Sequence, residues 1–140
     1  MPADSVLLNV NLDMVSRSVR RQLFAVGPGR YPGLAPYLSR TACSARVALM
    51  LGHDKGWSSS EDWTMQSDQG VFHGIGIPFV YFGVEDHPDY HQPTDDVSRI
   101  DVGFFAAATR AIALFVVLVD ANPAAAESAR AATGKVKAAP

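Results

Sequence analysis

The side chains best suited to chemistry are concentrated in one segment, GVEDHPDYHQPTDD at residues 83–96. Within its last twelve residues stand seven acidic or histidine side chains: Glu85, Asp86, His87, Asp89, His91, Asp95 and Asp96. Imidazole and carboxylate groups together suit a metal such as zinc, and aspartates can also orient a histidine ligand through hydrogen bonds. The alternative is a solvated acidic loop whose two histidines titrate freely. Composition alone leaves both interpretations open.

A second candidate is Asp13, in the sequence NLDM. It follows a predicted strand directly, and the carboxyl ends of strands are where α/β folds build their sites. The alternative is an aspartate that only forms a turn or caps a helix. Position alone therefore makes Asp13 a candidate for catalysis or binding without assigning it a role.

The third candidate is the pair Ser67 and Asp68, in QSDQGVFHGIGIP. A serine nucleophile with an acidic partner is one interpretation, but capping residues at the start of a short helix explain the pair more simply. The chain has no G-x-S-x-G elbow, no G-x-G-x-x-G after a strand and no Walker A loop. Metal ligands in GHDKG, residues 52–56, are a weaker alternative because that segment follows a helix end. Cys43 has no basic neighbour that would activate its thiol.

Around these candidates, strand-like and helix-like segments alternate. Strands are predicted at residues 5–12, 22–26 and 77–84, and helices at residues 34–51, 67–72 and 101–120. The run at 77–84 is continuously apolar, as expected for a strand covered on both faces. The alternation predicts an α/β layered domain with a mixed sheet over residues 1–120. Residues 121–140, rich in Ala and Lys, are predicted to be a disordered tail.

The overall composition excludes several classes of protein. The chain has 140 residues with twelve basic and fourteen acidic side chains, so it is not a strongly basic nucleic-acid binder. One cysteine rules out an internal disulfide framework. The longest apolar stretch, Phe104 to Val119, is interrupted by Thr109 and Arg110 and is shorter than the roughly 20 residues of a membrane span. The first residues, MPADSVLLNV, lack the features of a signal peptide.

Taken in order, three segments resemble the C-terminal half of metallopeptidase family 28. They are LNVNLDMVSRS, QSDQGVFHGIGIPFVYFG and DHPDYHQPTDDVSRID, and the resemblance runs from Ser5 to Val119. This family holds bacterial zinc aminopeptidases, the glutamate carboxypeptidase II group and glutaminyl cyclases. The resemblance implies part of a three-layer, phosphorylase/hydrolase-like α/β domain whose N-terminal half is absent. It also implies an exported parent enzyme, periplasmic or extracellular, that acts on a peptide substrate.

The resemblance also implies roles for named residues. Family enzymes hold two zinc ions with five protein ligands, and a glutamate acts as general base. By resemblance, Asp13 is a ligand of one zinc ion and His91 a ligand of the other. The pocket residues, or residues that orient the ligands, would be Asp68, Asp89, Tyr90 and Asp95.

Two departures from the family pattern bear on function. Gln69 stands where the family often has histidine, in SDQ instead of SDH. The twelve residues before Asp13 include no His and no Glu, so the remaining ligands and the general base are missing. We therefore expect the C-terminal part of a zinc aminopeptidase that is inactive alone and binds zinc weakly or not at all. The alternatives are a non-catalytic remnant that binds a partner, and a glutaminyl cyclase-like acyltransferase.

The predicted strands also bear on association. A sheet that lacks its neighbouring strands exposes backbone N–H and C=O groups along an edge, and such edges pair with other chains. We expect self-association, or pairing with the missing half of the domain.

Overall fold

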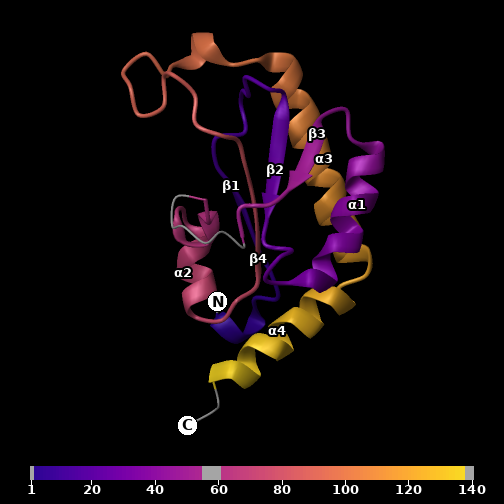
Figure 1. Ribbon diagram of the computed structural model, residues 1–140. Helices are drawn as coiled ribbons and strands as arrows, with labels where there is room; N and C mark the ends of the chain where they lie inside the picture. Colours follow the sequence, from indigo (N-terminus) through magenta and orange to yellow (C-terminus); the bar gives the residue numbers. More distant parts are fainter. Residues whose placement is uncertain (1, 55–60, 138–140) are drawn as a thin grey trace.

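A computed structural model describes residues 2–54 and 61–137 of the chain (Figure 1). Its four strands, β1 (Asn9–Leu12), β2 (Gln22–Val26), β3 (Ala48–Leu51) and β4 (Phe79–Gly83), form one sheet in the order β1-β4-β2-β3. β1 runs parallel to β4, β2 runs antiparallel to β4, and β3 runs parallel to β2. Because β1 and β4 are parallel, their carboxyl ends lie at the same edge of the sheet. This arrangement confirms the predicted mixed sheet.

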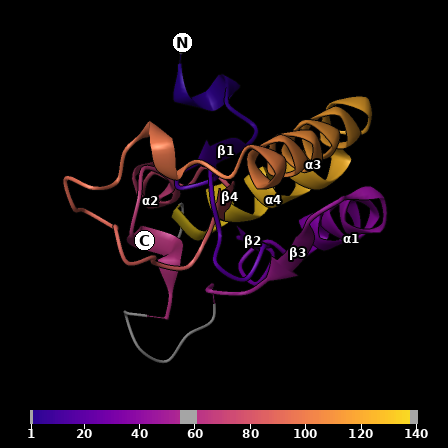
Figure 2. The same cartoon turned by 90° about the horizontal axis from the view of Figure 1, so that it is seen from above.

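Helices cover both faces of the sheet. Figure 2 shows α1 (Ala35–Ser44) and α3 (Val102–Ala121) on one side and the short α2 (Gln69–Gly74) on the other. All five residues of β4 are buried, and they alternate between the two layers. The Phe82 ring packs edge-on against Phe115 of α3, at 5.5 Å between centroids, whereas Tyr81 packs against Trp63 on the opposite face. The strand is therefore covered on both faces, as its continuous apolar sequence predicts.

The long helix α3 begins where the sequence places its N-cap. The Asp101 carboxylate accepts the backbone N–H of Phe104 at 2.8 Å. Six side chains of the helix are buried on its inner face: Phe104, Ala107, Ala108, Ala111, Ile112 and Phe115. The helix has 20 residues, and an 18-residue window within it has a mean hydropathy of 2.3. It therefore meets the length and composition of a membrane span, so the expectation that this stretch is too short is wrong. Its buried side nevertheless serves as a cover for the sheet.

The predicted helix over residues 34–51 is wrong in its second half. Helix α1 ends at Ser44, and residues 48–51, ALML, form strand β3 beside β2. A short apolar run has no periodicity that separates strand from helix. The open edge of β2 decides the outcome, because pairing with it satisfies the backbone groups of both strands. The sheet therefore has four strands where three were expected. The strand predicted at residues 5–12 is shorter than expected: β1 covers only Asn9–Leu12, Ser5 ends a 3-10 turn, η1 (Ala3–Ser5), and residues 6–8 are irregular.

The predicted disordered tail instead contains a helix, α4 (Ala124–Lys137). It lies across the end of the sheet opposite the 85–96 loop (Figure 1). Ala126 is buried, and the hydroxyl of Thr133 donates to the carbonyl of Gly76 at 2.7 Å. Alanine is the strongest helix former, and its small side chain allows close packing without a large apolar face. The composition of the tail therefore did not indicate this helix, which packs on the domain through alanine side chains.

Candidate functional site

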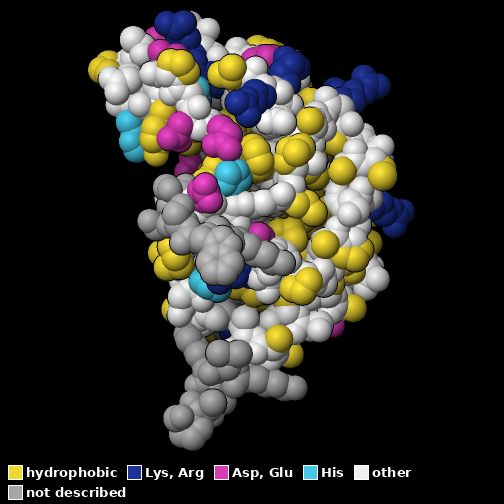
Figure 3. All heavy atoms as spheres, in the orientation of Figure 1, with side chains coloured by type: hydrophobic (Ala, Val, Ile, Leu, Met, Phe, Trp, Pro, Cys, Tyr) yellow, Lys and Arg dark blue, Asp and Glu magenta, His cyan; other side chains and the backbone are white. Residues whose placement is uncertain are grey.

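A cavity of 130 Å³ lies at the edge where β1 and β4 end. Asp13 follows β1, and its backbone N–H still donates to the carbonyl of Phe82 at 3.1 Å. The cavity is lined by residues from both strand ends and from the segments beside them: Asp13, Met14, Trp63, Gln66, Ser67, Tyr81, Val84, Glu85, Asp86 and Tyr90. Figure 3 shows acidic and histidine side chains gathered on the upper part of the molecular face that it displays. Of the predicted site residues, Asp13 and Tyr90 thus share one cavity.

The carboxylate of Asp13 is held by a hydrogen bond from Ser67. The Ser67 hydroxyl donates to Oδ2 at 2.9 Å, and Asn11 Nδ2 donates to the same hydroxyl oxygen at 3.2 Å. The residue after Asp13, Met14, has φ 56°, in the left-handed region that non-glycine residues rarely adopt. Such strained positions cluster at functional sites. Ser67 is therefore bonded to the candidate ligand and does not cap α2.

Gln69, which departs from the family pattern, is a buried structural residue. Its side chain is fully buried; Oε1 accepts from Asn11 at 2.8 Å and Nε2 donates to the carbonyl of Trp63 at 2.6 Å. Asp68 takes the capping position of α2, but its side chain makes no capping hydrogen bond. Asp68 is exposed and does not line the cavity. The prediction that Ser67 and Asp68 cap the helix with their side chains is wrong, because Ser67 bonds to Asp13 instead.

The 85–96 loop presents Tyr90 and His91 side by side. Their rings stack with centroids 3.9 Å apart, and His91 is exposed with φ 56°. Tyr90 lines the cavity, whereas His91 lies beside Tyr90 without lining it. The loop therefore places His91, the candidate histidine ligand, near the sheet edge where Asp13 lies. The left-handed backbone conformation of His91 must be stabilised by the rest of the loop.

The other two predicted loop residues, Asp89 and Asp95, pair with an arginine. Arg17 Nη2 lies 2.8 Å from Asp89 Oδ2 and 3.5 Å from Asp95 Oδ1. Asp89 also accepts a hydrogen bond from the Thr94 hydroxyl at 2.6 Å. Hydrogen bonds from Thr94 and then from Arg17 hold the pKa of Asp89 below its usual range. These carboxylates are thus held by the protein's own donors, consistent with an orienting role.

Tyr81 gives the cavity a buried hydroxyl among carboxylates. Burial, and then the negative charges of Asp13 and Asp86, raise the pKa of Tyr81 far above its usual value. At neutral pH the phenol therefore remains protonated and can donate a hydrogen bond. The Tyr81 side chain runs along β4 toward the cavity, so that its hydroxyl group lies over Gly83. A Cβ atom added to Gly83 would lie only 2.2 Å from the Tyr81 hydroxyl oxygen.

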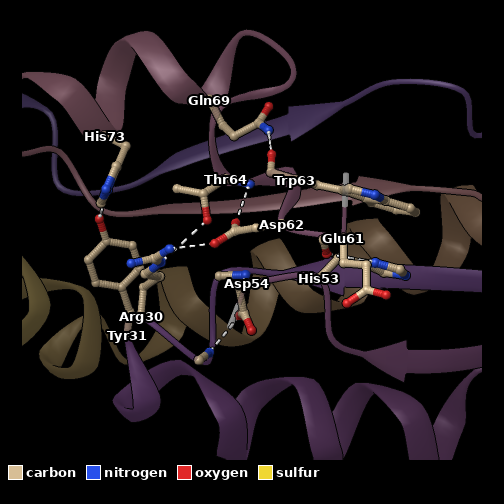
Figure 4. A network of polar contacts seen from close by, with 12 residues as sticks. Arg30, Tyr31, His53, Asp54, Glu61, Asp62, Trp63, Thr64, Gln69 and His73 are labelled. Carbon is tan, nitrogen blue, oxygen red and sulfur yellow. Dashed lines mark hydrogen bonds and ion pairs between the residues drawn. The ribbon is translucent and has the colours of Figure 1, made fainter. Parts of the chain in front are cut away.

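The weaker candidates at residues 53 and 54 do not act together. His53 lies beside Trp63 (Figure 4), with the two rings stacked at 3.7 Å between centroids. Its Nε2 lies 3.1 Å from Glu85 Oε1. The carboxylate of Asp54 is buried and accepts the backbone N–H groups of Gly27 and Gly29 at 2.8 and 2.6 Å. The two side chains therefore serve different parts of the fold. Residues 55 and 56 of the GHDKG segment lie outside the described residues.

A further polar cluster lies between α2 and the turn after β2. The Tyr31 hydroxyl and His73 Nδ1 share a hydrogen bond of 2.7 Å, and Arg30 pairs with Asp62 at 2.6 Å (Figure 4). Burial, and then the positive charge of Arg30, hold the pKa of His73 below its usual range. This histidine is therefore neutral at physiological pH.

In the part of the chain that the structure describes, no group of three or more His, Cys, Asp or Glu residues could hold a metal ion. Sequence inspection missed four residues that shape the site: Asn11, Arg17, Trp63 and Tyr81. Asn9 and Asn11 alternate in an otherwise apolar strand, which was a readable signal of a polar face at the site. The contacts of Arg17 join positions about 70 residues apart, and nothing local indicates them.

Comparison with known proteins identifies the family of the chain. A search of the curated proteins and a search of the solved structures found no significant match. The family model described as peptidase family M28 matches residues 2–116. This match covers most of the chain, including both strands that end at the cavity and the loop that carries Tyr90 and His91. With its mixed sheet and its site at the carboxyl ends of β1 and β4, the chain belongs to peptidase family M28.

Proposed function

We propose that the chain is the C-terminal part of a zinc-dependent aminopeptidase, which hydrolyses the N-terminal peptide bond of a peptide substrate. The observation that carries the proposal is the parallel pairing of β1 and β4 in a family M28 chain. This pairing puts Asp13 and the loop bearing Tyr90 and His91 at one edge of the sheet. Asp13 and Tyr90 line the same cavity there.

The donors at this edge fit zinc in kind but not in number. A carboxylate oxygen from Asp13 and an imidazole nitrogen from His91 are groups that zinc takes, yet a zinc site needs at least three protein ligands. The described residues supply no group of three. We therefore propose weak zinc binding by these 140 residues and no turnover. Bound zinc would supply an activated water and polarise the scissile carbonyl group.

The chain's own residues would prepare the site. Ser67 fixes one oxygen of Asp13 by its hydrogen bond, which restricts the orientation of the carboxylate. Tyr90 and Tyr81 present hydroxyl groups to the cavity, where a protonated phenol can donate to a developing negative charge. The stacked ring of Tyr90 limits the orientations of His91.

Zinc binding tests the proposed ligands. We expect calorimetry to detect weak binding that is lost in Asp13→Ala and in His91→Ala, because each variant removes a donor. His73→Gln is the matched control, since His73 bonds to Tyr31 and neither residue lines the cavity. Binding that survives both alanine variants, or that is lost only in the control, would contradict the proposal.

Activity measurements test the proposal that this chain alone does not turn over a substrate. We expect no hydrolysis of a leucine anilide by the purified chain with added zinc, because the described residues supply no group of three donors that could hold zinc and its activated water. Hydrolysis that disappears in Asp13→Ala would show that the chain is catalytically sufficient.

A non-catalytic role is the second candidate, and the small number of metal donors in the described residues favours it. It predicts no zinc binding at all at Asp13 or His91. The calorimetric experiment therefore separates the two candidates.

A further inference from the structure

Arg17 lies between the two loops that carry the predicted ligands. Its backbone follows Asp13 by four residues, in a segment that is fixed to α3 because the Ser16 carbonyl accepts the N–H of Asp101 at 3.2 Å. Its side chain is only 16% exposed. A buried guanidinium group needs acceptors around it, and the acceptors here come from the 85–96 loop.

The guanidinium group contacts three side chains of that loop. Nη2 donates to Asp89 Oδ2 at 2.8 Å, contacts His87 Nδ1, and lies 3.5 Å from Asp95 Oδ1. His87 and Asp89 precede the Tyr90–His91 pair, and Asp95 follows it. Every ion pair that joins the two loops in the described part of the chain is made by Arg17. One side chain thus holds the loop on both sides of Tyr90 and His91.

The loop needs such an anchor because it has little regular structure near these residues. Its local backbone hydrogen bonds join Tyr90 to His87, Gln92 to Asp89 and Asp95 to Gln92, at 2.8, 2.9 and 3.0 Å. These bonds close tight turns within the loop, but they do not tie it to the segment after Asp13. The left-handed conformation of His91 must also be held by contacts outside that residue.

A single nitrogen of the Arg17 guanidinium group, Nη2, makes its contacts with the 85–96 loop. The Nε atom of Arg17 is buried with no hydrogen-bond partner among the described residues. An unpaired buried donor is unfavourable, so the contacts of Nη2 must offset it for the arginine to remain here.

We infer that Arg17 is a positioning residue that clasps the 85–96 loop to the segment after Asp13 and so sets Tyr90 and His91 relative to Asp13. The inference rests on the proposed function in one respect only: it takes the two loops as halves of one site.

Hydrogen exchange measured by NMR tests the clasp without any metal. In Arg17→Gln, we expect the amides of Tyr90, Gln92 and Asp95 to exchange about 10-fold faster than in the wild-type chain, while amides of β4 keep their protection. Asp89→Asn removes the same contact from the loop side and should act on the same amides. Arg17→Lys keeps the charge and should restore part of the protection.

Arg21→Gln is the matched control. Arg21 makes an ion pair of 2.6 Å with Asp101, but this pair is far more exposed and joins no part of the 85–96 loop. We expect the control to leave the three loop amides unchanged. Unchanged loop amides in both Arg17→Gln and Asp89→Asn would overturn the inference, as would equal acceleration in Arg21→Gln. If Arg17→Gln fails to fold, Asp89→Asn and Arg17→Lys decide the outcome.

A zinc titration of the same variants measures zinc affinity, which a more mobile 85–96 loop with no role in the site would not change. We expect the zinc affinity measured from the His91 imidazole resonance to fall about 10-fold in Arg17→Gln and to stay unchanged in Arg21→Gln. If the His91 resonance of the wild-type chain does not change on addition of zinc, the proposed function is contradicted. The hydrogen-exchange experiment would still test whether Arg17 holds the 85–96 loop. Zinc affinity that is equal in Arg17→Gln and the wild-type chain would contradict the positioning role.

Discussion

At the scale of single residues, the site is built by side chains that bond to one another across long stretches of sequence. Ser67 holds Asp13 from 54 residues away, and Asn11 reaches Gln69 across 58. Asp13 and the 85–96 loop could be predicted because a carboxylate after a strand and a cluster of ligands are local signals. The residues that orient them could not, because their partners are fixed only when β1 and β4 pair.

Asp54 provides a stability test at this scale. Its single Oδ2 atom accepts two backbone N–H groups of the turn after β2. Asp54→Ala would leave a buried donor at Gly27 and a partly buried donor at Gly29 without an acceptor, and we expect a loss of about 2–4 kcal/mol in the free energy of unfolding. Asp54→Asn keeps an acceptor oxygen and should lose less than half as much. Equal losses in urea denaturation would show that the charge matters and the hydrogen bonds do not.

His73 predicts a pH dependence of stability. Its pKa is lower in the folded chain than the roughly 6.5 of an unfolded chain, because of burial and the charge of Arg30. The unfolded state therefore takes up a proton first, so this contribution is complete above about pH 6.5 and is lost as pH falls through the folded pKa. We expect the melting temperature to fall as the pH is lowered below about 6.5.

The same scan in His73→Gln checks the cause. We expect a flatter profile in this variant, whereas His53→Gln should retain the wild-type slope. An unchanged slope in His73→Gln would assign the pH dependence to another group.

At the scale of elements, features that depend on neighbouring residues were predicted correctly, whereas a strand that depends on pairing with another strand was not. Strand β2 has the predicted bounds, and Asp101 caps α3 as predicted, because both depend on neighbouring residues. Strand β3 was missed because residues 48–51 become a strand only beside β2. Helix α4 was missed because its alanines gain their stability from docking, which composition does not report.

The docking of α4 can be tested with a matched pair of substitutions. Ala126 is buried at 1% exposure, while Ala131 lies on the exposed side of the same helix. We expect Ala126→Asp to lower the free energy of unfolding by more than about 2 kcal/mol, because it buries a charge. Ala131→Asp should change it by no more than about 0.5 kcal/mol. Equal effects in thermal denaturation would mean that α4 does not pack on the domain.

At the scale of the whole molecule, the fold has an open sheet edge and exposed apolar side chains. Strand β1 is at the edge of the sheet, and Leu12 at its end is 49% exposed. On α3, Phe105 and Val116 are 42% and 44% exposed. Unprotected edges and apolar patches of this kind promote association.

We propose that the purified chain self-associates through these surfaces. Size-exclusion chromatography with light scattering should give a dimer or a larger species. Leu12→Lys should shift the mass toward the monomer, because a charged side chain on an edge strand opposes pairing. A wild-type monomer of 15.0 kDa would contradict the proposal.

The central claim is that Asp13 and the 85–96 loop form one metal-binding edge of a family M28 domain. A crystal structure of the chain soaked in zinc, with anomalous diffraction measured at the zinc edge, tests it most directly. We expect an anomalous peak about 2.0–2.2 Å from a carboxylate oxygen of Asp13 or from a ring nitrogen of His91. Anomalous peaks found only at other side chains, with both of these residues free of metal, would contradict it.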